Sequence, residues 1–154
     1  MESLERKLDL LRTIGPFAQI PTGPLRPVAE AVEVLRFNAG DMIVRQGDPG
    51  DAVYGLTDGA AEVWLEDPPQ RPVLLRTMRS GQLFGETAVL YRGPRSASIK
   101  AKTDLTTLKL PGPVFIELLR STPEVALRVA VALAQRLASD RYTLMSDPTD
   151  SGAA

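Results

Sequence analysis

Cysteine and histidine are both absent from the 154 residues of this chain. The missing thiols exclude disulfides, cysteine-ligated metal sites and thiol catalysis. The missing imidazoles remove the commonest general base and the usual zinc ligand, so Ser-His-Asp chemistry cannot occur within the chain. Metal binding by oxygen ligands alone remains allowed. We therefore expect no catalytic residues, no metal site and no cofactor, and we expect that the chain is not an enzyme.

Long apolar runs and a strong charge imbalance are missing as well. No run approaches the ~20 apolar residues of a membrane span, and the opening MESLERKLDLL mixes both charges and lacks a signal-peptide core. The formal net charge of -1 gives no global attraction to nucleic acid or anionic membrane. We expect a cytoplasmic location, alone or as the soluble part of a larger protein, with no nucleic-acid binding and no membrane insertion by this chain.

The spacing of apolar residues predicts helices at both ends of the sequence. Leu4, Leu8 and Leu11 repeat at the interval of one helical face. Thr22 precedes a second helical pattern as its expected cap, and Pro123 is suited to the first position of the last helix. We predict helices over residues 3–14, 22–31, 113–120 and 123–145.

Between these helices the pattern is that of short strands. Apolar or alternating runs are separated by turn signals such as Gly47-Asp48-Pro49-Gly50-Asp51 and Asp58-Gly59. Strands interrupted this often favour an antiparallel sandwich or barrel. The length of 154 residues indicates a single domain. We predict strands over residues 32–37, 42–45, 53–57, 61–65, 73–78, 97–102 and 105–110.

The segment FGETAVLYRGPRSA, residues 84–97, combines the residue types that hold a phosphate and a ribose. Gly85 has no Cβ, which allows a close approach of backbone to ligand. Arg95 supplies a fork of donors that matches two phosphate oxygens, and Ser96 adds a hydroxyl and an amide. Glu86 would accept the proton of a ribose 2′-hydroxyl, with Arg95 offsetting the repulsion between carboxylate and phosphate.

This segment resembles the phosphate-binding cassette of cyclic-nucleotide-binding domains. The family pattern is Phe-Gly-Glu, a variable residue, Ala, two apolar residues, a short variable stretch, then Pro-Arg, a small residue and Ala. Turns such as Gly40-Asp41 are also similar to those of the family, and the resemblance covers roughly residues 16–142. The matches at the family spacing are Phe84, Gly85, Glu86, Ala88, Val89, Leu90, Pro94, Arg95, Ser96 and Ala97.

The resemblance implies a mainly β fold with flanking helices. Its centre would be an antiparallel, jelly-roll-like β-roll over about residues 32–110, preceded by N-terminal helices and carrying a short cassette helix. The B and C helices of the family would follow over about residues 113–145. We predict one domain over residues 1–146 and a disordered tail over residues 147–154.

The resemblance also assigns a ligand site, residue by residue. The base of the nucleotide would lie against Val63 and Arg76 of the β-roll, and Arg136 of the last helix is the candidate lid. Ser96 favours cAMP over cGMP, because family members that prefer cGMP often carry threonine there. The predicted ribose-phosphate contacts are Gly85, Glu86, Thr87, Ala88, Arg95, Ser96 and Ala97.

The expected function is a cyclic-nucleotide sensor that transmits binding through movement of its C-terminal helices to an attached domain or partner. An alternative is the N-terminal effector domain of a truncated catabolite-activator-type transcription regulator, which needs a helix-turn-helix that this sequence does not show. A phosphodiesterase would usually need a metal-activated water, which the missing histidines and cysteines disfavour. The intact Glu86 and Arg95 argue against a degenerate domain that binds no nucleotide.

Overall fold

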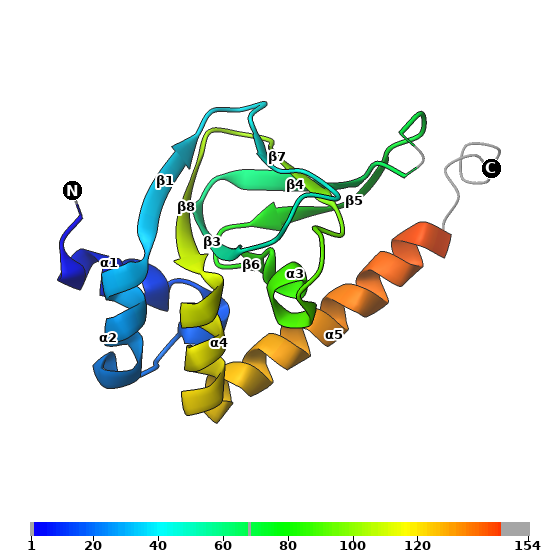
Figure 1. Cartoon of the computed structure of the whole chain (residues 1–154). Helices are drawn as coiled ribbons and strands as arrows, with labels where there is room; N and C mark the ends of the chain where they lie inside the picture. Colours follow the sequence, from blue (N-terminus) through cyan, green and yellow to red (C-terminus); the bar gives the residue numbers. More distant parts are fainter. Residues whose placement is uncertain (1, 68, 146–154) are drawn as a thin grey trace.

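The computed structural model describes residues 2–67 and 69–145 and shows two antiparallel sheets closed into a β-roll, with helices at one end and along one side (Figure 1). The sheet orders are β1-β8-β3-β6 and β2-β7-β4-β5. The predicted tail, residues 147–154, and the predicted domain end at residue 146 lie outside the described residues. The strands are β1 (Glu33–Phe37), β2 (Met42–Val44), β3 (Ala52–Asp58), β4 (Ala60–Leu65), β5 (Val73–Arg79), β6 (Leu83–Phe84), β7 (Ser98–Ala101) and β8 (Leu105–Pro111).

The helices precede and follow the strands, as the apolar periodicity predicts, and the cassette helix interrupts them, as the resemblance implies. The first pair packs beside α4, and α5 extends from there past the cassette helix α3 toward the opposite end of the roll (Figure 1). The helices are α1 (Leu4–Arg12), the 3-10 helix η1 (Gly15–Phe17), α2 (Thr22–Ala31), α3 (Glu86–Tyr91), α4 (Gly112–Ser121) and α5 (Pro123–Met145). The expectation of a mainly β fold with flanking helices is confirmed.

Two central strands are apolar on both faces because each separates two cores. In β8, Leu108 and Leu110 contact the helices, whereas Leu105 points into the roll. The same alternation in β3 sends Val53 to the helical side and Tyr54 to the interior of the roll. The helical core and the interior of the roll therefore share these strands, which couples the helices mechanically to the sheets.

The structure differs from the sequence prediction at small features, among them the 3-10 helix η1, which was not predicted. Strand β6 was not predicted, because it has only two residues, Leu83 and Phe84, and pairs with β3 just before the cassette. Thr22 was expected to cap α2, but it is the first helical residue, and the cap position is held by Pro21. The Thr22 hydroxyl instead accepts a hydrogen bond of 2.9 Å from Arg12 of α1, which joins the two helices.

We predict that Phe115→Ala lowers the free energy of unfolding by about 3–5 kcal/mol, because this side chain of α4 is fully buried in the helical core. Urea unfolding followed by circular dichroism measures the change. Glu117→Ala, at an exposed position of the same helix, is the control and should stay within about 0.5 kcal/mol of the parent chain. Equal effects of the two substitutions would contradict the assignment of this core.

Candidate functional site

The second residue of the cassette is a glycine that other residues cannot replace without strain. Gly85 has a φ of 84°, in the left-handed region that favours glycine, and it directly precedes α3. A Cβ added there would lie 2.5 Å from Nη1 of Arg95 and 3.2 Å from the carbonyl oxygen of Ala52. The missing side chain therefore makes room for the arginine.

Arg95 is a buried cation whose orientation is fixed by the backbone around it. Its Nη1 donates to the carbonyl oxygen of Gly85 at 2.9 Å, and its Nη2 donates to that of Ala52 at 2.8 Å. Its guanidinium carbon lies 5.8 Å from the ring centroid of Tyr54, which stacks on Phe84 at 5.0 Å. With only 5% of Arg95 exposed, the guanidinium is positioned before any ligand arrives.

The loop before β3 holds the second half of the cassette in place. The backbone amide of Arg95 donates to the carbonyl oxygen of Asp48 at 2.7 Å, and that of Gly47 donates to the carbonyl oxygen of Arg95 at 2.9 Å. Gly50 is packed so closely against α3 that an added Cβ would lie 2.3 Å from the Cβ of Ala88. The turn motif seen in the sequence is therefore a support for the cassette.

A small cavity of about 40 Å³ lies between the cassette, the β-roll and α5. Every predicted site residue except Glu86 lines it, including Val63 and Arg76, which are paired across β4 and β5. Three further apolar residues line it that were not among the predicted ligand contacts, although Phe84 is part of the cassette pattern. They are Val44, Phe84 and Ile99.

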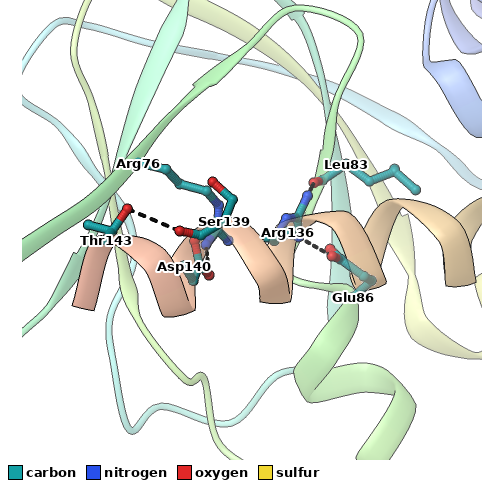
Figure 2. A network of polar contacts seen from close by, with 7 residues as sticks. All are labelled: Arg76, Leu83, Glu86, Arg136, Ser139, Asp140 and Thr143. Carbon is teal, nitrogen blue, oxygen red and sulfur yellow. Dashed lines mark hydrogen bonds and ion pairs between the residues drawn. The ribbon is translucent and has the colours of Figure 1, made fainter. Parts of the chain in front are cut away.

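Glu86 lies beside this cavity and forms an ion pair with Arg136 of α5 (Figure 2). Arg136 also donates to the carbonyl oxygen of Leu83 at 2.6 Å. Only 2% of Glu86 is exposed, and a carboxylate buried to this extent requires a cation beside it. The Oε2 atom of Glu86 has no hydrogen-bond partner within residues 2–67 and 69–145.

A second ion pair joins α5 to the roll about one helical turn further along. Asp140 contacts Arg76 of β5, and it stands four residues after Arg136, on the same face of the helix (Figure 2). Burial lowers the pKa of Arg76 from its ordinary value, and the hydrogen bond that Arg76 donates to Asp140 opposes this shift. Asp140 was not among the predicted site residues, because its partner Arg76 lies 64 residues away in the sequence.

The two halves of α5 are attached to the protein by different forces. The first half buries Val125 and Val129 in the helical core, and Arg128 donates to the carbonyl oxygen of Ala18 at 2.5 Å. From residue 134 to residue 145 the helix has no buried residue. The contacts that join this second half to the roll include the ion pairs of Arg136 and Asp140 and the hydrogen bond from Arg136 to Leu83.

The fold and the site define a class: a β-roll with a cavity that is lined by a buried, oriented arginine, bordered by a buried carboxylate and closed by a C-terminal helix. Residues 34–122 match the family model described as "Cyclic nucleotide-binding domain". The chain belongs to this family, as the cassette indicated. Among residues 2–67 and 69–145, no helix is long and apolar enough to cross a membrane, and no cluster of acidic side chains is suited to a metal ion.

Similar proteins include kinase regulatory subunits. The cAMP-dependent protein kinase regulatory subunit of Emericella nidulans is 36% identical over 118 residues, which are 77% of this chain and 26% of that protein. The corresponding subunit of Dictyostelium discoideum is 36% identical over 88 residues, 57% of this chain and 27% of that protein. The chain thus spans roughly a quarter of the length of these curated relatives.

Solved structures show the same fold. The regulatory domain of Toxoplasma gondii PKA, co-crystallised with cAMP, has a TM-score of 0.75 at 25% identity, covering 85% of this chain and 50% of that one. The catabolite activator protein of Thermus thermophilus has a TM-score of 0.72 at 28% identity, covering 84% of this chain and 61% of that one. The β-roll with flanking helices is therefore shared by kinase regulatory domains and bacterial regulators.

We predict that Arg136→Ala releases the second half of α5, because it removes the cation that pairs with Glu86. Amide hydrogen exchange over residues 135–145 should become at least about tenfold faster. Gln135→Ala, at the neighbouring exposed position, is the control and should leave these rates unchanged. Unaltered exchange in Arg136→Ala, with the thermal melt still cooperative, would show that the ion pair does not hold the helix.

Proposed function

We propose that this chain is a non-enzymatic sensor of cyclic nucleotides that favours cAMP over cGMP and signals through α5. The observation that carries the proposal is the convergence of the cassette, two β-roll residues and Arg136 on one cavity beside Glu86. These groups come from distant parts of the sequence, and the packing of a β-roll does not require a buried arginine and a buried carboxylate at the same place. A ligand with one anionic and one hydroxyl group would use both.

In this proposal Arg95 binds the phosphate. Two backbone carbonyls already accept hydrogen bonds from its Nη1 and Nη2 atoms, which holds the plane of the guanidinium in one orientation. Its further N–H donors remain available to an anion in the cavity. Ser96 and Thr87 line the same cavity and would add hydroxyl donors. The absent Cβ of Gly85 would let the phosphate approach the backbone closely.

Glu86 would bind the 2′-hydroxyl of the ribose. Its Oε1 atom is paired with Arg136, whereas its Oε2 atom is buried and has no partner in the described part of the chain. A buried acceptor without a hydrogen bond costs about 1–3 kcal/mol, and a ribose hydroxyl would recover this free energy by donating to it. Arg136 would then remain the counter-charge of the carboxylate.

The base would require α5 to shift. Val44, Val63 and Ile99 offer an apolar surface, but a cavity of about 40 Å³ is far smaller than the roughly 300–1,000 Å³ of ligand pockets. Since Arg76 and Arg136 line the same cavity and both take part in the ion pairs of α5, enlarging it disturbs these pairs. A ligand that favours the enlarged state would therefore move the second half of the helix.

The movement would be detected by an attached domain or a separate partner. The similar proteins include regulatory subunits of cAMP-dependent kinases and a co-crystal with cAMP, which supports cAMP as the ligand and a regulatory role. Ser96 supports a preference for adenine over guanine, because the family resemblance places serine at this position in cAMP-binding members. The junction between β8 and α4, at Leu110-Pro111-Gly112, is the proposed hinge.

We predict that calorimetric titration shows binding of cAMP, and weaker binding of cGMP. Arg95→Ala should weaken cAMP binding on the order of 10- to 100-fold or more, because charge-assisted hydrogen bonds are worth ~1.5–3 kcal/mol each. Arg92→Ala is the control, since Arg92 is an exposed arginine of the same segment. The affinity of the Arg92→Ala chain for cAMP should equal that of the parent chain.

Arg95 also holds two carbonyls, so a melting curve must accompany the titration of Arg95→Ala. Arg95→Lys, which keeps the charge and lacks the fork of donors, should bind cAMP at an intermediate strength. Wild-type affinity in a folded Arg95→Ala chain would refute the proposed site. Production of AMP from cAMP by the purified chain would refute the proposal of a non-enzymatic sensor.

A further inference from the structure

Ser98, directly after the cassette, carries a buried hydroxyl that the proposed ligand site does not use. Only 1% of Ser98 is exposed, although it is a polar residue at the start of β7. A buried hydroxyl needs hydrogen-bond partners, because burial without them costs free energy. Ser98 has two such partners, Gln46 and Glu66, and both belong to segments that are distant in the sequence.

The hydroxyl of Ser98 is part of a closed cycle of three hydrogen bonds. Its oxygen accepts from the backbone amide of Gln46 at 2.9 Å, and it donates its proton to Oε2 of Glu66 at 2.5 Å. The backbone amide of Glu66 donates in turn to Oε1 of Gln46 at 2.7 Å. Each of the three residues therefore donates one hydrogen bond and accepts one within the cycle.

Glu66 determines the orientation of the Ser98 hydroxyl. A serine hydroxyl has one proton to donate and two lone pairs that accept. Because the proton of Ser98 is directed to Glu66, a lone pair remains for the backbone amide of Gln46. An ionised carboxylate makes hydrogen bonds about twice as strong as those between neutral groups. Glu66, half-buried directly after β4, is thus well suited to hold the hydroxyl in this orientation.

The cycle fixes the start of the loop that holds Arg95. Gln46, a member of the cycle, is directly followed by Gly47 and Asp48. These two residues exchange backbone hydrogen bonds of 2.9 and 2.7 Å with Arg95. Since Ser98 stands three residues after Arg95, the loop is joined to the chain at the end of the cassette and again just beyond it. Loss of the Ser98 hydroxyl would remove the second of these attachments.

We propose that Ser98 and Glu66 are positioning residues for the phosphate site and that they act through the backbone of Arg95. The inference rests on the proposed function, in which Arg95 binds the phosphate. Neither Ser98 nor Glu66 is among the residues that line the cavity, so neither would touch the ligand. A guanidinium that binds two phosphate oxygens requires a defined geometry, so a small displacement of its backbone weakens the contact.

Amide hydrogen exchange in the absence of nucleotide tests the cycle itself. In Ser98→Ala, the backbone amide of Arg95 should exchange at least about tenfold faster than in the parent chain, because the loop that accepts its hydrogen bond is no longer joined to β7. Thr107→Val is the matched control, since it removes a hydroxyl from a 0% exposed residue of β8, in the other sheet. Parent-like exchange of Arg95 in Ser98→Ala, or equally fast exchange in both variants, would overturn the proposal.

Replacements of Glu66 test whether its carboxylate orients the hydroxyl. Glu66→Ala should accelerate exchange at Arg95 as Ser98→Ala does, because the hydroxyl loses its acceptor. Glu66→Gln keeps an oxygen that can accept, so its exchange rate should lie between those of Glu66→Ala and the parent chain. Asp67→Ala, at the exposed neighbouring position, is the control and should exchange at the parent rate. Parent-like exchange in Glu66→Ala would overturn the role of Glu66.

Calorimetric titration with cAMP tests whether Ser98 acts through Arg95. Ser98→Ala should weaken binding about 5- to 10-fold in the parent chain but less than about twofold in a chain that already carries Arg95→Ala, because residues that act as a unit are not additive. Weakening by the same factor in both backgrounds would indicate a general structural effect and overturn the positioning role.

The titration also separates this inference from the proposed function on which it rests. If the parent chain binds cAMP and the Ser98→Ala chain binds it with equal affinity, the positioning role is refuted and the proposed function stands. If the parent chain binds no cAMP, the proposed function is refuted, and the positioning role with it.

Discussion

The burial of the Glu86 carboxylate is the constraint on which the arrangement of the site depends. A carboxylate that is 2% exposed must be paired with a cation, and the cation comes from Arg136, fifty residues further along the chain. This requirement holds the second half of α5 against the roll, where the helix otherwise has no buried residue. The same carboxylate is the proposed acceptor for the ribose, so ligand binding and helix position act on one group.

The side chain of Arg95 and the second half of α5 are held in position by different kinds of contact. The guanidinium of Arg95 donates to two backbone carbonyls and lies near the ring of Tyr54, and none of these groups belongs to α5. The second half of α5 depends on two ion pairs whose partners line or border the cavity. If Arg95 binds the phosphate as proposed, a rigid site next to a helix held by polar contacts is a suitable arrangement for a switch, because the ligand can change one element while the other stays in place.

The sequence predicted most of this arrangement because the cassette is local. Gly85, Glu86 and Arg95 lie within eleven residues, and their chemistry could be interpreted without knowing the fold. The positions of Val63, Arg76 and Arg136 came from family resemblance, and the structure brings all three to the cavity. Asp140 was missed because its partner, Arg76, is sixty-four residues away, and no local pattern indicates a pair between a strand and a helix that distant. The two-residue strand β6 and the role of the Thr22 hydroxyl were missed because both depend on neighbours in space.

The central claim is that a cyclic nucleotide enters the cavity by shifting the second half of α5. Spin labels at Gln135→Cys and Lys100→Cys, diluted with unlabelled chain, would report the distance between this helix and strand β7. The account predicts that saturating cAMP changes this distance distribution, and that the change disappears when Arg95 is replaced by alanine. A distribution that saturating cAMP leaves unchanged in the parent chain would contradict the account.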